Sequence, residues 1–132
     1  MEKSDKLIAV GAIMAAIAVM IGAFGAHIVK DMVTPERLEN WETGAQYHFY
    51  HSIAIILTGL VARNNSSELL KWAGVIFAVG VLFFSFSLYT LALTDITWLG
   101  AITPLGGVAF IIGWLLLAKV CIPSKKQQEE NN

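Results

Sequence analysis

The chain has 132 residues, of which 56% are hydrophobic and 14% are charged. Because soluble proteins carry about 25% charged residues, this composition excludes an ordinary soluble domain and indicates a membrane protein. A net charge of −1 without a basic block argues against nucleic acid as a partner, and the single cysteine, Cys121, excludes an internal disulfide and a cysteine-rich metal site.

Four apolar stretches are long enough to cross a bilayer, which takes about 20 mainly apolar residues. In chain order they are Leu7–Val29, Gly44–Ala62, Leu69–Leu93 and Pro104–Ile122. The sequence therefore predicts an all-α integral membrane bundle of four transmembrane helices. It forms a single domain over residues 1–122, followed by a disordered polar tail over residues 123–132.

The first stretch follows two lysines and so resembles a signal peptide. Its apolar run is longer than the roughly 7–15 residues of such a peptide, so we expect it to be retained as a transmembrane helix. The first turns of the second stretch are less hydrophobic than the rest, because they contain Gln46, His48 and His51.

Helix-start signals mark the connections between the stretches. Thr34-Pro35 predicts a helix cap followed by proline at the first helical position, and opens a short polar helix with Leu38 and Trp41 on one face. Asn65 with Glu68 three residues later predicts a capping box. Thr103-Pro104 repeats the cap-then-proline pattern before the fourth stretch.

The distribution of Lys and Arg predicts how the chain is oriented. Seven of these residues belong to the termini and the second connection, whereas only Lys30 and Arg37 belong to the first connection and none to the third. Since cytoplasmic segments are enriched in Lys and Arg, we expect a multi-pass protein of the plasma (inner) membrane with both termini in the cytoplasm.

Polar residues gather toward the outer ends of the predicted helices. His48 and His51 share one face of the second helix because they are three residues apart, and Ser85 and Tyr89 share a face of the third. His27 lies near the outer end of the first helix. Ionisable residues inside a membrane are costly and mark candidate functional sites. The candidate polar pocket comprises His27, Tyr47, His48, His51, Ser85 and Tyr89.

Each of these residues also has a structural interpretation. Tyr47, Tyr50, Trp41, Trp98 and Trp72 lie near helix ends, as in an interfacial aromatic belt. Serine and threonine in membrane helices usually bond to the carbonyl one turn back. Trp114 lies deep in the fourth stretch, where its indole N–H needs a partner, so we expect this residue to face the bundle interior.

The histidines allow sharper hypotheses. Three imidazoles can bind zinc or copper, but no carboxylate accompanies them on the same turn, and no metal or other cofactor is predicted. Haem ligation by two histidines is possible in a four-helix bundle, but the sequence offers little else in support of it. A solvated cavity that binds a ligand or proton remains open, because histidine titrates near neutral pH.

Small residues spaced by four predict close helix packing in lipid, at Gly11/Ala15, Gly22/Ala26, Gly74/Ala78 and Ala109/Gly113. Gly106-Gly107 serves the same purpose at the start of the fourth helix. These faces can pack within one chain or form a homo-oligomer, and both alternatives stay open.

Four segments resemble a known family: Gly22–His27, Tyr47–Leu57, Ser85–Leu93, and Leu99–Gly107 with Phe110–Trp114. They are similar to the small bacterial membrane proteins of the domain of unknown function 423 family, which has transmembrane-256-like relatives in animals. The resemblance implies a four-span inner- or plasma-membrane protein and no reaction. The family tends to have glycine where this chain has Phe86 and Asp95, and often glutamine at His48, which favours His27 and His51 as site residues.

The leading hypothesis is a non-enzymatic membrane protein that acts through helix packing, with itself or with a membrane-protein partner. The alternative is an outward-facing, histidine-lined binding or transport site for a small ligand, proton or metal. An enzyme is third, because the sequence shows no nucleophile–base pair, paired catalytic carboxylates or cofactor loop.

Overall fold

The computed structural model describes residues 2–123, which are helical almost throughout and include no β-strand. The elements are α1 (Lys3–His27), η1 (Val29–Asp31), α2 (Pro35–Ala62), α3 (Glu68–Thr94), η2 (Thr97–Ala101) and α4 (Thr103–Cys121). The prediction of an all-α bundle with four long helices is confirmed. Of the predicted polar tail only Pro123 is described, and residues 124–132 lie outside the described part of the chain.

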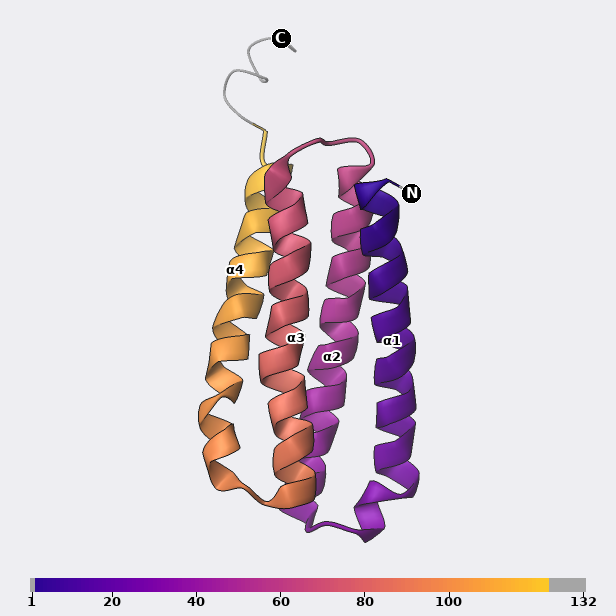
Figure 1. Cartoon of the computed structure of the whole chain (residues 1–132), viewed down its shortest axis with the longest axis vertical. Coiled ribbons are helices and arrows are strands. Elements are labelled where there is room, and N and C mark those ends of the chain that lie inside the picture. The colour runs from indigo at the N-terminus through magenta and orange to yellow at the C-terminus, as the bar shows by residue number, and fades with distance from the viewer. Residues whose placement is uncertain (1, 124–132) are drawn as a thin grey trace.

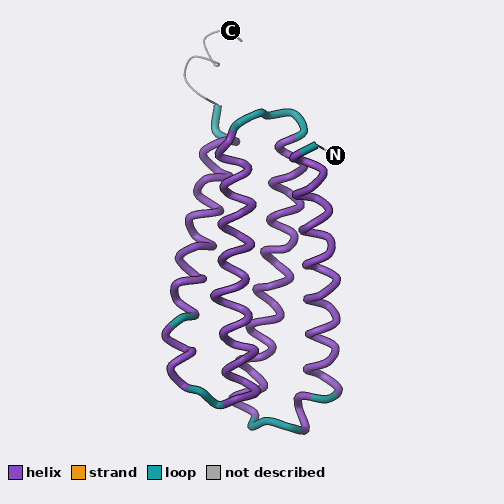
Figure 2. The backbone as a smooth tube through the Cα atoms, viewed as in Figure 1, coloured by secondary structure: helices purple, strands orange, loops and turns teal. Residues whose placement is uncertain are grey.

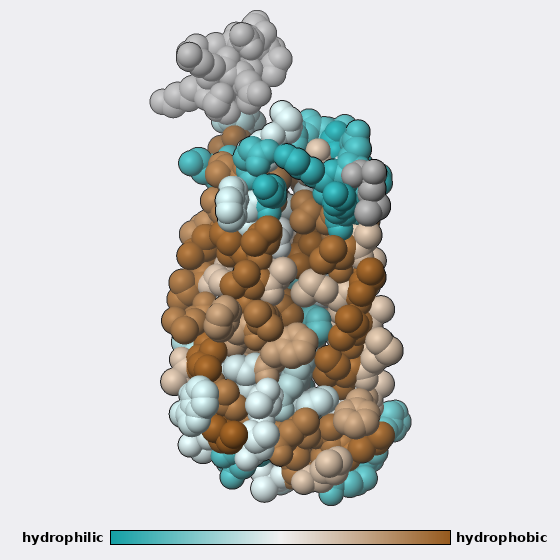
Figure 3. All heavy atoms as spheres, in the orientation of Figure 1, coloured by the Kyte–Doolittle hydropathy of each residue, from teal (hydrophilic) through white to brown (hydrophobic). Residues whose placement is uncertain are grey.

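The four long helices run alternately up and down, so α1 begins and α4 ends at the same end of the bundle (Figure 1). Each packs against its neighbour in the chain, and short loops join them (Figure 2). Buried residues concentrate in α2 and α3, whereas α1 and α4 bury few. Hydrophobic side chains cover the middle of the surface in view, and hydrophilic ones gather at the ends (Figure 3). This distribution suits a bundle surrounded by lipid.

Three helical segments have the length and hydropathy of membrane spans: Lys3–Asp31, Glu68–Thr94 and Thr97–Cys121. The segment α2 has 28 residues, or about 42 Å of helix, but its polar residues lower its hydropathy. Four of those residues, His48, His51, Ser52 and Thr58, are buried. Two of them bond to their own helix: Ser52 Oγ donates to the His48 carbonyl at 2.7 Å, and Thr58 Oγ1 to the Ala54 carbonyl at 2.8 Å. Hence α2 hides polar groups that a hydropathy average counts against it.

Glycines let the helix backbones approach closely at each crossing. A Cβ added at Gly11 in α1 would meet the Ser52 carbonyl oxygen of α2 at 2.8 Å, and one at Gly59 in α2 would meet the Ser4 carbonyl oxygen at 2.9 Å. Between α3 and α4, a Cβ at Gly106 would meet the Gly80 carbonyl oxygen at 2.8 Å. Small residues are therefore required where backbones touch, as expected for association in lipid.

One of the three predicted helix caps is confirmed and two are wrong. Thr34 caps α2, since its Oγ1 accepts from the Arg37 N–H at 3.3 Å. The cap of α3 is Ser67 rather than Asn65, whose Oδ1 instead accepts from the Ser67 N–H at 2.9 Å. Thr103 is the first residue of α4 rather than its cap, because η2 continues the turn before it.

Ion pairs join the helix ends. Arg37 of α2 binds Asp95 after α3, with 2.6 Å between Nε and Oδ1, and this carboxylate raises the pKa of the guanidinium. Asp95 ends α3 with a φ of 57°, the left-handed conformation that favours glycine. This backbone conformation explains why glycine suits position 95. The aspartate of this chain adds an ion pair with Arg37 that glycine would lack.

The α3–α4 crossing gives a matched pair of test variants. Gly106→Ala places a methyl group against the backbone of α3, and such overpacking costs about 1–3 kcal/mol. Gly107→Ala meets only the Phe84 ring at 3.9 Å and should be neutral, or stabilising by up to about 1 kcal/mol through helix propensity. SDS titration of both variants in mixed micelles measures the difference; equal unfolding free energies would contradict the close crossing.

Candidate functional site

One side chain-mediated hydrogen bond joins α2 to each of the other long helices. Trp41 Nε1 donates to the Ile21 carbonyl of α1 at 2.9 Å. His48 Nδ1 lies 3.1 Å from the Tyr89 hydroxyl of α3, and Trp114 Nε1 of α4 donates to His51 Nε2 at 3.2 Å. We call the three α2 residues Trp41, His48 and His51 the α2 hub. All three are buried, so these bonds form away from solvent.

The partners of His51 determine its tautomer. Nδ1 lies 2.7 Å from the Tyr47 carbonyl oxygen, which can only accept, so Nδ1 carries the proton. Nε2 receives the Trp114 indole N–H, which can only donate, so Nε2 is unprotonated. The ring also stacks on Phe110 with centroids 3.4 Å apart and planes 8° apart. His51 is therefore neutral with both nitrogens engaged, which suits a helix clamp and leaves no lone pair for a metal.

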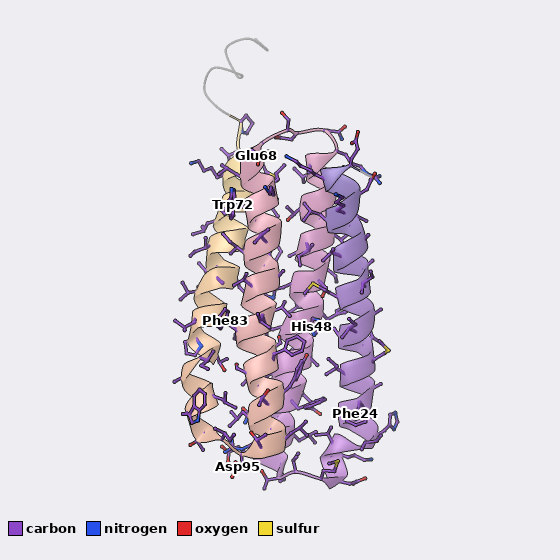
Figure 4. The ribbon with its side chains drawn as sticks, viewed as in Figure 1. Phe24, His48, Glu68, Trp72, Phe83 and Asp95 are labelled. Atoms are coloured by element: carbon purple, nitrogen blue, oxygen red, sulfur yellow. The ribbon has the colours of Figure 1, made fainter. Side chains whose placement is uncertain are left out.

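His48 has a different environment. It is only 1% exposed, and in the view of Figure 4 it lies between the ribbons of α3 and α1. Its Nδ1 pairs with the Tyr89 hydroxyl, while Nε2 has no hydrogen-bonding partner among residues 2–123. The ring is tilted against Phe86, with centroids 5.9 Å apart. His48 thus keeps one nitrogen available for a further hydrogen bond.

Ser85 lies one helical turn before Tyr89 and is fully buried. Its Oγ lies near the Tyr89 side chain but makes no hydrogen bond of normal geometry to any described residue. Gly44 of α2 makes room for the neighbouring Tyr89 ring, because a Cβ at residue 44 would lie 2.8 Å from that ring. A buried polar group without a partner costs about 1–3 kcal/mol, and among the described residues Ser85 Oγ is the buried side-chain atom of this kind.

The structure brings together three of the six predicted pocket residues: His48, Ser85 and Tyr89. His51 lies on the α4 side, with Trp114 and Phe110 as neighbours. Tyr47 contacts His51 through its carbonyl, and Tyr47 itself is 38% exposed with its ring stacked on Phe84. The pocket is therefore more deeply enclosed than expected, and Tyr47 supplies backbone rather than its hydroxyl.

His27 does not join this cluster. It is exposed at the end of α1, and its side chain makes no hydrogen bond to the described residues. The buried face of α1 is set by Ser4, Gly11, Ala18 and Gly25, which recur every seven residues. His27 follows Gly25 by two residues, about 200° around the helix. The assignment of His27 to the candidate polar pocket is therefore corrected.

Trp41 was assigned to the interfacial belt, and this assignment is wrong. The ring is 5% exposed and packs against Gly25 of α1, whose missing side chain leaves room for it. It also contacts Tyr89, with centroids 4.9 Å apart. Trp98 and Trp72 are exposed, as a belt requires. The prediction that Trp114 faces the interior is wrong for much of its ring, because the residue is 42% exposed, but its N–H does find a partner in His51.

Within residues 2–123, no three His, Cys, Asp or Glu side chains lie close enough to hold a metal ion. The chemistry that the arrangement offers is hydrogen bonding: one imidazole nitrogen, one phenol and one hydroxyl, enclosed by aromatic rings.

This fold and its enclosed polar cluster define a small all-α membrane protein. The family model described as "Protein of unknown function (DUF423)" matches residues 21–107, and the chain belongs to this family. It is 46% identical over 110 residues to a "UPF0382 membrane protein" of Staphylococcus epidermidis, covering 83% of this chain and 89% of the relative. It is 43% identical over 116 residues to the "UPF0382 membrane protein YwdK" of Bacillus subtilis, covering 87% and 94%. No solved structure matches the chain significantly.

Removing one N–H tests the clamp between α2 and α4. Trp114→Phe keeps an aromatic ring but deprives His51 Nε2 of its donor. Interhelical hydrogen bonds in membranes contribute about 0.6–1.7 kcal/mol, so we expect a loss of roughly 1 kcal/mol in unfolding free energy. Trp98→Phe is the control, because Trp98 is 65% exposed. Equal effects of the two substitutions in SDS titration would show that the indole N–H carries no stability.

Proposed function

We propose that this chain is a non-enzymatic protein of the plasma (inner) membrane that crosses the bilayer four times and acts by presenting its packed helices to a membrane-protein partner or to a second copy. The observation that carries the proposal is the α2 hub. It ties α2 to three helices and holds the outer faces of α1 and α4 in fixed positions. Both faces are largely apolar and exposed, as required for contact with lipid or another membrane helix.

The proposed orientation places both termini in the cytoplasm. Lys3, Arg63, Lys71 and Lys119 belong to the end of the bundle where α1 begins, and Lys30 and Arg37 to the opposite end. Supporting this, an excess of Lys and Arg marks the cytoplasmic side of membrane proteins.

A cysteine introduced at Ser66 tests this orientation. In a Cys121→Ser background, it should react with an impermeant maleimide only from the cytoplasmic side. Labelling from outside would contradict the proposed orientation.

Crosslinking in native membranes tests the partner hypothesis. The wild-type chain should yield one discrete crosslinked species, either a dimer or a complex with one partner. Trp114→Phe, which loosens the hub, should lower its yield several-fold, whereas Trp98→Phe should leave it unchanged. A clean monomer in the wild type would contradict the proposal, as would a yield that is insensitive to Trp114→Phe at equal protein level.

A second candidate function is an outward-facing binding or transport site for a small ligand, proton or metal. It is favoured by Ser85 Oγ, which is enclosed and has no hydrogen-bonding partner among the described residues, and by the nearby imidazole of His48, whose Nδ1 pairs with Tyr89. Tyr89 lies between them in the network and His51 closes the α4 side. In this reading His48 and Ser85 bind the ligand.

Mass spectrometry and elemental analysis of the gently purified protein test this site. Under the binding hypothesis, a stoichiometric small ligand or metal is retained, and it is lost in His48→Gln and in Ser85→Ala without a change in oligomer size. His27→Gln is the control, since His27 lies outside the cluster. Finding no ligand, together with reduced detergent stability of His48→Gln, would assign the cluster a purely structural role.

A further inference from the structure

A groove opens between α1 and α3 at the end of the bundle where both helices begin. Its volume is about 790 Å³, within the range of about 300–1,000 Å³ typical of organic ligand sites. Its walls are apolar, and the residues that form them are Leu7, Val10, Ile55, Gly74, Val75 and Ala78. An apolar groove of this size, beside exposed valines that face lipid, can accommodate a hydrocarbon chain.

Charged side chains line the mouth of this groove. Three lysines, Lys3, Lys6 and Lys71, stand against two glutamates, Glu2 and Glu68. Lys3 pairs with Glu68 at 3.1 Å. Lys6 and Lys71 form no ion pair with any described residue, and Lys71 Nζ lies 5.8 Å from the centre of the Trp72 ring. The mouth therefore has two lysines available for an added anion, and it carries more positive than negative charge.

The backbone adds to this positive character. Both α1 and α3 begin at the mouth, so the positive ends of two helix dipoles lie beside the lysines. The cap of α1, Glu2, forms no side-chain hydrogen bond to the first turn of the helix. Basic pockets between membrane helices on the cytoplasmic side are suited to anionic lipid headgroups.

We infer that this groove binds an anionic phospholipid, with its phosphate at Lys6 and Lys71 and one acyl chain between α1 and α3. The charge specifies the headgroup, because an apolar groove alone would accept neutral lipids equally well. The site is separate from the cluster around His48 and Ser85, and of the proposals above it rests only on the orientation that places this end of the bundle in the cytoplasm.

Native mass spectrometry tests the headgroup specificity, with chain-matched phosphatidylglycerol and phosphatidylcholine supplied in equal amounts. We expect the wild type to retain phosphatidylglycerol at least several-fold more than phosphatidylcholine. The double variant Lys6→Gln/Lys71→Gln should remove this preference. Lys119→Gln is the control, because Lys119 in α4 does not line the groove. Equal retention of the two lipids by the wild type, or a preference that survives in the double variant, would overturn the inference.

A second pair of variants tests the acyl chain and does not depend on the lysines. Val75→Trp should fill the groove and reduce retention of phosphatidylglycerol several-fold. Val79→Trp is its control, because Val79 is one turn further along α3, equally exposed at 41%, and outside the groove. Both proteins should elute at the same size. Equal lipid retention by the two variants would overturn the inference, as would a protein segment found in the groove in place of lipid.

Discussion

The structure depends on one polar helix placed among apolar ones. In lipid, burial of hydrocarbon does not drive helices together, because the lipid chains are as apolar as leucine. Hydrogen bonds and close packing must do so instead. The α2 hub supplies one bond to α1, one to α3 and one to α4. These three hydrogen bonds therefore share a single helix, and the bond between Ser87 Oγ and Thr103 Oγ1 at 2.7 Å joins α3 to α4 beside them.

Close packing complements these bonds. Gly25 leaves room for the Trp41 ring, Gly44 for the Tyr89 ring, and Gly113 for the Phe77 ring. The hydrogen bonds of Trp41 and Tyr89 are thus built into contacts between a glycine on one helix and an aromatic ring on another, while Phe77 packs against the rings of His51 and Trp114. Enlarging one of these glycines would move a ring, and moving a ring would lengthen a hydrogen bond. Polar specificity and steric fit are for this reason coupled in the same residues.

Much of the fold followed from sequence patterns, because long apolar runs and the Thr34-Pro35 cap signal depend only on local chemistry. The i, i+3 spacing placed His48 and His51 on one face of α2 for the same reason, but their different partners, Tyr89 of α3 and Trp114 of α4, depend on how the helices pack. The position of His27 depended on the rotation of α1 about its axis. The small residues at every seventh position, from Ser4 to Gly25, indicate this rotation, because they mark the buried face of α1. Predicting that Trp41 is buried would have required knowing that Gly25 of α1 lies opposite it, and no local sequence pattern gives this information.

The central claim is that the α2 hub is a set of real hydrogen bonds with defined proton positions, and the bond between Trp114 and His51 tests it most directly. Nitrogen-15 NMR of the labelled protein in a bilayer mimic can locate the imidazole proton and detect scalar coupling across an N–H···N bond. The account predicts a neutral His51 with its proton on Nδ1, and coupling between Trp114 Nε1 and His51 Nε2. A proton on Nε2, or a His51 ring that is charged at neutral pH, would contradict it.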